Sequence, residues 1–139
     1  MFLIKGQDDP RNDLNTTYIW WKFIRENYLQ DLEGKDWKLY VTSDHKQAEN
    51  DAIEAFGKER VIRIPGLNTH VDVENGLSEC TRVHKPMLDF HFMQNCDKLA
   101  VSWSGFGKLG AWNRDDPIKD LNVFLWGKWY KASYNMTIL

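Results

Sequence analysis

The chain alternates between short apolar runs and longer segments whose apolar residues recur at helical spacing. The short runs are typical of buried strands and predict strands at residues 2–4, 37–41, 60–64, 99–102 and 123–126. The longer segments predict helices at residues 14–32, 46–56, about 80–95 and about 106–113. The first helix shows the period best, with apolar side chains at Leu14, Tyr18, Trp21, Ile24, Tyr28 and Leu32.

Turn-forming residues mark the boundaries of these elements. Asp13 is placed to cap the first helix, and Gly34 follows its end. Pro65-Gly66 stops the third strand, while Pro86 lies near the start of the third helix, where a missing amide costs little. Residues 67–79 have no clear period and predict a long loop, which is more often functional than idle.

The order strand–helix–strand–helix predicts an α/β fold, a Rossmann-like parallel sheet with helices on both faces. Ligands of such sheets bind at the carboxyl ends of the strands. Polar residues directly after strands are therefore the candidates, and they lie at residues 5–8, 42–45 and 102–107.

Composition narrows the functional classes. A length of 139 residues is enough for one domain with a core, and the net charge of −2 does not favour nucleic acid or an anionic membrane as partner. No apolar run is long enough to span a bilayer, since a span needs about 18 residues or more. The seven tryptophans fit a dense core or an exposed binding face. Cys80 and Cys96 are compatible with one disulfide or with two buried thiols.

The segment from Ser102 to Gly107 has the composition of an anion-binding turn. Glycines after a strand let backbone amides approach an anion, and the helix that follows presents its positive end to the same place. Ser102 and Ser104 add hydroxyl donors. The turn therefore predicts a phosphate or diphosphate site, and the alternative is a tight turn whose glycines serve packing only.

Two classes of ligand fit this turn. Residues 105–110, GFGKLG, match the dinucleotide fingerprint and indicate an NAD(P)-binding oxidoreductase domain as one alternative. That fingerprint normally follows the first strand and precedes an acidic residue at the end of the second. Here it comes late, and the acidic residues after it stand in a breaker region or before the next strand, at Asp115, Asp116 and Asp120.

The segment 85–112 resembles the donor-binding half of fucosyltransferases of the α1,6- and protein-O-fucosyltransferase type. The resemblance is carried in order by Leu88-Asp89-Phe90-His91-Phe92, Cys96-Asp97, the apolar run 99–101 and Ser102-Trp103-Ser104. The run 40–44, YVTSD, is similar to a strand of that family ending in "A-T-D", and residues 4–8 stand where the family has an arginine-rich motif after a strand.

The resemblance implies the nucleotide-sugar-binding lobe of a two-lobed (GT-B type) glycosyltransferase, which transfers fucose from GDP-fucose to a glycan or protein hydroxyl with inversion. It implies that Asp89 receives the guanine ring, since a carboxylate accepts two N–H donors. A surface Asp near a helix start is the alternative. The residues implied to hold the diphosphate are Ser102, Ser104, Gly105 and Phe106.

Three further residues carry two interpretations or depart from the family pattern. His91 matches a family histidine, and a structural histidine in an apolar helix is the alternative. Asp44, beside His45, is placed either to face the cleft or to cap the helix that follows. Lys5 stands where the family has a catalytic arginine; lysine supplies charge but no bidentate fork, so another cation, Lys108 or Arg114, is an alternative.

Residues 1–139 are thus expected to form a single nucleotide-sugar-binding domain, a fragment or truncated half of a two-domain enzyme. The acceptor site and a general base would lie on an N-terminal lobe. No metal is expected, since His45, His70, His84 and His91 are dispersed.

The resemblance implies the secretory pathway, Golgi or ER lumen, although the chain shows no signal or anchor. The acceptor-pattern asparagines Asn15 and Asn135 point the same way. A non-catalytic interaction domain that exposes Trp126 and Trp129 is a further alternative.

Overall fold

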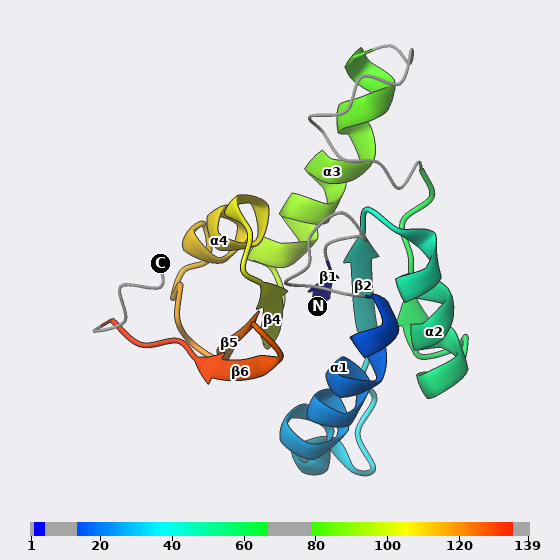
Figure 1. Ribbon diagram of the computed structural model, residues 1–139, viewed down its shortest axis with the longest axis vertical. Helices are drawn as coiled ribbons and strands as arrows, with labels where there is room; N and C mark the ends of the chain where they lie inside the picture. Colours follow the sequence, from blue (N-terminus) through cyan, green and yellow to red (C-terminus); the bar gives the residue numbers. More distant parts are fainter. Residues whose placement is uncertain (1, 5–13, 67–78, 135–139) are drawn as a thin grey trace.

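A computed structural model describes residues 2–4, 14–66 and 79–134 (Figure 1). The described strands form a six-stranded sheet in the order β3-β2-β1-β4-β5-β6. Neighbours from β3 to β5 pair in parallel, and β6 pairs antiparallel with β5. The strands are β1 (Phe2–Ile4), β2 (Leu39–Ser43), β3 (Val61–Ile62), β4 (Leu99–Ser102), β5 (Leu121–Leu125) and β6 (Lys128–Lys131).

The helices connect successive parallel strands, as the alternating pattern predicted. The long predicted helix at 14–32 is divided: α1 continues into a π-helical turn and a 3-10 turn before the chain reaches Gly34, whose φ is +75°. The helical segments are a 3-10 turn (Leu14–Thr16), α1 (Thr17–Ile24), the π-helical turn (Arg25–Leu29), a second 3-10 turn (Gln30–Leu32), α2 (Lys46–Phe56), α3 (Glu79–Gln94) and α4 (Gly105–Trp112).

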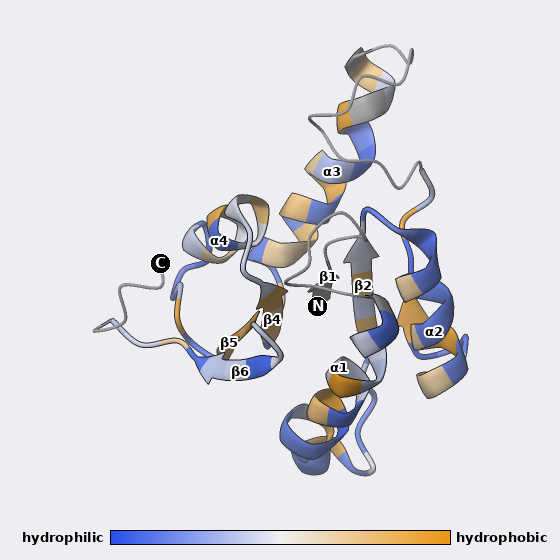
Figure 2. Cartoon of the chain, in the orientation of Figure 1, coloured by the Kyte–Doolittle hydropathy of each residue, from blue (hydrophilic) through white to orange (hydrophobic). Residues whose placement is uncertain are grey.

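The central strands are buried on both sides. All residues of β2 and β4 are buried, which explains why they read as continuous apolar runs rather than as alternating patterns. Figure 2 shows hydrophobic colouring along β4 and β5, whereas β6, which lies at one edge of the sheet, has hydrophilic ends. The α/β class predicted from the sequence is confirmed.

Two cores lie on opposite faces of the sheet. One packs α1 and α2 against Leu39 and Val41 of β2, and the other packs α3 and α4 against Tyr40 of the same strand. Because successive strand side chains point to opposite faces, this alternation assigns each helix pair to one face. The helices therefore cover both faces, as predicted, and the second face includes the polar residue Thr42, two positions after Tyr40.

Most of the tryptophans pack in the first core, and two of the others are exposed. Trp20 packs against Trp129 with ring centroids 4.6 Å apart, and Phe23 stacks on Trp129 at 4.0 Å. Trp112 and Trp126 are exposed by contrast. Of the two tryptophans expected to face a partner, Trp129 is thus part of the packing and Trp126 lies on the surface.

The last strand departs from the prediction. The sequence pattern ended with a strand at 123–126, but β5 begins at Leu121, and a two-residue turn at Trp126 and Gly127 leads into β6. Both turn residues have positive φ, 51° and 76°, as a type I′ hairpin turn requires. Only Gly127 is a glycine, and Trp126 stands where this turn usually has asparagine, aspartate or glycine.

Tyr28 ties the α1 side of the molecule to the start of two strands. Its buried hydroxyl donates to the carbonyl oxygen of Leu99 at 2.9 Å and accepts from Asn122 Nδ2 at 2.6 Å. Burial raises the pKa of the Tyr28 phenol to about 12. The folded protein therefore favours the neutral, protonated form of Tyr28.

We predict that Tyr28→Phe lowers the free energy of unfolding at pH 7 by about 1–3 kcal/mol, because buried partners lose a hydrogen bond. In the wild type the Tyr28 stabilisation is complete below the ordinary phenol pKa of 10.0 and is lost as the pH rises through about 12. The variant lacks this titration, so the gap between the two proteins should narrow by about 1 kcal/mol at pH 11. Urea unfolding followed by circular dichroism from pH 7 to 11 measures it, and a gap independent of pH would contradict the prediction.

Candidate functional site

The candidate site is the edge of the sheet at which β1, β2 and β4 end, called here the carboxyl edge. Strand order reverses between β1 and β4: β2 and β3 lie to one side of β1, whereas β4, β5 and β6 follow on the other. In open α/β sheets, ligands bind outside the carboxyl ends of the strands at such a reversal. Residues 102–105 leave β4 at this edge, and residues 44–45 leave β2.

The β4–α4 turn, defined as Ser102, Trp103, Ser104 and Gly105, is held from both sides. The Trp103 amide donates to the carbonyl oxygen of Phe124 at 3.0 Å, and Ser104 caps α4 by accepting from the Gly107 amide at 3.1 Å. Ser102 is fully buried, and its hydroxyl has no hydrogen-bond partner within the described part of the chain.

The glycines of this segment have different roles. A Cβ added at Gly105 would meet no atom within 4 Å, whereas one at Gly110 would lie 2.7 Å from Met93 Sδ. Gly110 therefore allows α4 to approach α3, while the Cβ position of Gly105, in the first turn of α4, meets no other atom. The first amides of a helix have no acceptor inside it. Packing thus explains one glycine of the fingerprint and leaves the first available to a ligand.

The two described cations predicted to neutralise the diphosphate, Lys108 and Arg114, lie at different edges of the sheet. Lys108 Nζ lies 3.5 Å from the ring centroid of Trp103, next to the β4–α4 turn. Arg114 is buried and donates to the carbonyl oxygens of Lys119 at 2.8 Å and Cys96 at 3.1 Å, near the starts of β5 and β4. It lies at the opposite edge of the sheet and is wrong as a cation for this site. Lys5 lies outside the described residues.

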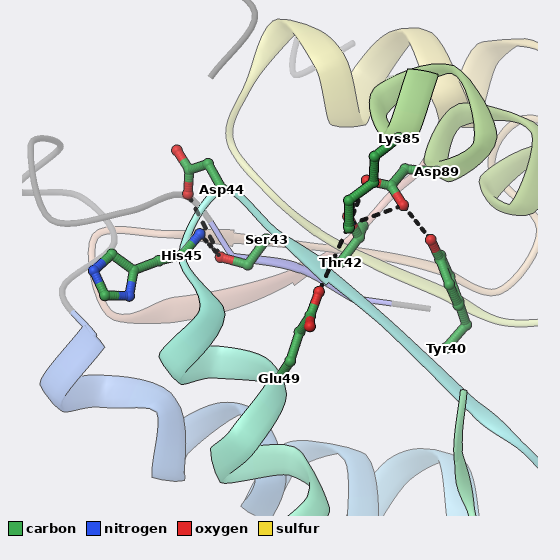
Figure 3. Close-up of polar contacts among 8 residues, drawn as sticks. All are labelled: Tyr40, Thr42, Ser43, Asp44, His45, Glu49, Lys85 and Asp89. Carbon is green, nitrogen blue, oxygen red and sulfur yellow. Dashed lines mark hydrogen bonds and ion pairs between the residues drawn. The ribbon is translucent and has the colours of Figure 1, made fainter. Parts of the chain in front are cut away.

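At the end of β2, the helix cap is not the expected residue. His45, not Asp44, is the N-cap of α2, and its Nδ1 accepts from the Gln47 amide at 3.4 Å. Ser43 Oγ accepts from the His45 amide at 3.0 Å and lies 3.5 Å from Asp44 Oδ1 (Figure 3). The Asp44 carboxylate is partly exposed, so it lies at the carboxyl edge without a capping role.

Asp89 lies inside the protein, 5 % exposed, and its carboxylate is held by three protein donors (Figure 3). The Lys85 ammonium lies 2.9 Å from Oδ2, the Thr42 hydroxyl donates to Oδ2 at 2.5 Å, and the Tyr40 hydroxyl donates to Oδ1. The structure thus gives Asp89 a structural role that the sequence did not predict. A guanine edge would have to displace these donors.

The cluster extends to α2 through Glu49, whose Oε1 lies 3.6 Å from Lys85 Nζ. Lys85 and Glu49 are 2 % and 4 % exposed, so the ammonium is shared by two carboxylates away from bulk water. Burial, and then the hydrogen bond to Asp89, raises the pKa of the Tyr40 phenol far above its usual value. Tyr40 therefore remains a neutral donor to the carboxylate.

The other predicted residues do not gather at Asp89. His91 is exposed, because side chains two residues apart on a helix point about 200° from one another. Phe106 is partly buried and lies 5.8 Å from the Phe90 ring, which gives it a packing role. Cys80 and Cys96 are free thiols, so the disulfide alternative is wrong; Cys80 is exposed and Cys96 partly exposed, so the alternative of two buried thiols is wrong as well.

Lys85, Tyr40 and Glu49 were not among the predicted site residues, whereas Thr42 belonged to the candidate run 42–45 without an assigned role. The spacing of Lys85 and Asp89 by four residues, and the same-face positions of Tyr40 and Thr42, are signals that could have found part of the cluster. Elsewhere in the described residues no group of three His, Cys, Asp or Glu side chains is placed to hold a metal ion. None of the described helices is both long enough and apolar enough to cross a membrane.

Comparison with known proteins adds no relative: no family model, no curated protein and no solved structure matches this chain.

Asp89→Ala should lower the free energy of unfolding by about 3–5 kcal/mol, because it leaves the buried Lys85 ammonium without its nearest carboxylate. Asp31→Ala, whose side chain is 84 % exposed, is the matched control and should change stability by about 0.5 kcal/mol or less. Urea unfolding of both variants measures this.

A double-mutant cycle of Lys85→Met with Asp89→Ala should give an interaction energy of about 1–3 kcal/mol. An interaction energy near zero would show that the two residues do not stabilise one another.

Proposed function

We propose that this chain is the donor-binding half of a fucosyltransferase-like glycosyltransferase and that it binds GDP-fucose at the carboxyl edge. In the proposal the diphosphate lies at the reversal of strand order between β1 and β4, against the N-terminus of α4. The strand order 3-2-1-4-5-6 supports it, since this is the order of Rossmann-like sheets that bind nucleotides at the point of reversal.

One observation carries the proposal: α4 begins at the reversal point with an exposed glycine, Gly105, as its first residue. The first two amides of α4, at Gly105 and Phe106, have no acceptor within the helix, and a Cβ on Gly105 would touch nothing within 4 Å. Helix N-termini bind phosphate through such amides and through the positive end of the helix dipole. Ser102 at the same turn is fully buried, so its hydroxyl is not available to a ligand in this structure.

Charge near the turn fits a departing diphosphate. Lys108 is the described cation beside the turn, held over Trp103, and it would act together with Lys5 from outside the described residues. Fixed donors aimed at the developing charge would stabilise the leaving group as the bond to fucose breaks. Asp89 then acts as a positioning residue that fixes α3, and the partly exposed Asp44 replaces it as the carboxylate available to the nucleoside.

The rest of the reaction needs groups beyond this lobe. Inversion at fucose requires an acceptor hydroxyl and a base on the face opposite the diphosphate. An N-terminal lobe would supply the base and the binding site for the acceptor, and the reaction would take place in the secretory pathway. A glycan or protein would be the acceptor.

The NAD(P) alternative is less well supported. Gly110 of the fingerprint packs on Met93, and Asp120, one of the acidic residues after it, precedes β5 at the opposite edge of the sheet. In the fingerprint the ribose-binding carboxylate follows the glycines by about 20 residues and lies at the carboxyl edge, whereas Asp44 lies at that edge but precedes these glycines in the chain. An interaction domain without nucleotide binding keeps exposed Trp126 as its supporting observation.

Isothermal titration with GDP, GDP-fucose and NAD tests the proposal. We expect saturable binding of GDP and GDP-fucose, and Gly105→Asp should weaken it roughly ten- to hundredfold, because a carboxylate would face the diphosphate. The same substitution places negative charge at a helix N-terminus, so it should preserve stability or raise it by about 0.3–1 kcal/mol.

Asn113→Asp is the matched control: it adds the same charge at the other end of α4 and should change GDP affinity by about twofold or less. Absence of heat with both guanine nucleotides would overturn the proposal. Binding of NAD alone would favour the dinucleotide alternative, and binding of no nucleotide would favour the interaction domain.

A further inference from the structure

A second concave site lies at the amino edge, the edge of the sheet at which β2 and β3 begin. It is a depression of about 500 Å³ open to solvent, lined on one side by the π-helical turn and the 3-10 turn after it, and on the other by residues 33–37 and Arg60. In Figure 1 this region lies at the opposite end of β2 from the carboxyl edge. It shares no residue with the proposed nucleotide site.

The depression carries more positive than negative charge. Its ionisable lining residues are Arg25, Lys35, Arg60, Glu33 and Asp36, three cations against two carboxylates. Asp36 pairs with Arg60 Nη1 at 2.9 Å but is 82 % exposed, and exposed pairs contribute little to stability. An incoming anion can therefore replace this contact at small cost.

Both guanidinium groups are fixed before any ligand arrives. Arg25 lies over the Phe56 ring, 5.0 Å from its centroid, and donates through Nη2 to the carbonyl oxygen of Ala55 at 2.7 Å. Arg60 lies 4.8 Å from the ring centroid of Trp37 and donates through Nη1 to the Trp37 carbonyl oxygen at 3.1 Å.

Each guanidinium has five N–H donors, and these contacts use one terminal nitrogen of each. The stacked arginines thus present their remaining donors without further loss of side-chain freedom.

The backbone at this site is also unusual. The helix widens to a π-helical turn at Arg25–Leu29 and then tightens to a 3-10 turn at Gln30–Leu32, and Arg25, Leu29, Gln30 and Leu32 all line the depression. Single π-helical turns inside helices occur frequently at functional sites. Here the turn places an arginine at its start and a leucine at its end on the same depression.

We propose that this depression binds a small molecule carrying an oxyanion, a carboxylate or a phosphate group. Arg25 and Arg60 donate to the oxyanion, and Lys35 adds charge at the rim. Leu29, Leu32 and Trp37 contact the less polar part of the ligand. The guanidinium fork matches the oxygen spacing of both anions.

The test is an NMR titration of ¹⁵N-labelled protein with inorganic phosphate and, separately, with succinate, at constant ionic strength. Saturable shifts of the Gly34, Lys35 and Trp37 amides are expected with at least one probe; the probe that saturates identifies a phosphate or a carboxylate ligand. Arg25→Gln and Arg60→Gln should each weaken binding roughly tenfold, the value of one charged hydrogen bond.

Arg63→Gln is the matched control, because Arg63 is exposed and does not line the depression. Should an arginine variant lose its dispersed spectrum, the exposed Lys35→Gln replaces it, with an expected loss of about threefold. Shifts that stay linear, or that weaken equally in Arg63→Gln, would overturn the proposal. Gly105→Asp should leave these shifts unchanged, so this site and the nucleotide site can fail independently.

Discussion

One buried ion pair determines how the second face of the sheet is built. Lys85 and Asp89 meet 2.9 Å apart with almost no exposure, and neither charge could remain there alone. The hydroxyls of Tyr40 and Thr42 occupy further positions on the carboxylate, so the pair is satisfied only when α3 lies at one height against β2. A slide of α3 along the strand would carry the pair with it, and would separate the buried carboxylate from both hydroxyls and the Lys85 ammonium from Glu49 of α2.

The position of α3 determines where α4 lies, because the two helices are in close contact at a glycine. Gly110 lets α4 lie against Met93 of α3, with no room for a Cβ between them. Because Ser104 joins α4 to the end of β4, the first amides of α4 must then open at the reversal of strand order. Asp89 thus contributes to the position of α4 at the carboxyl edge through packing, whereas the resemblance implied direct contact with a guanine ring.

Sequence alone predicted the elements and failed where partners are distant along the chain. The pattern placed β4 at its observed residues because residues 99–101 form an apolar run that ends at Ser102. It placed Asp89 and the β4–α4 turn beside one another in sequence, but not the partners of Asp89, since Thr42 lies 47 positions away. Arg114 shows the same limit: a basic residue after α4 looked like a cation for the turn, although its hydrogen bonds lie at the other edge. The antiparallel β6 was missed because Trp126 occupies a turn position that glycine or asparagine usually marks.

Anions at the two edges of the sheet would have to be bound by different means. At the carboxyl edge α2 and α4 begin, so a ligand there would meet backbone amides and positive dipole ends. At the amino edge the same geometry presents helix C-termini, whose unpaired carbonyl oxygens repel an anion. Arg25 satisfies one of these carbonyl oxygens by donating to that of Ala55 in the last turn of α2. An anion at the amino edge would therefore be bound by the guanidinium N–H groups that make no bond to the protein. Stacking on an aromatic ring holds the guanidinium groups of Arg25 and Arg60 in place without using their N–H donors.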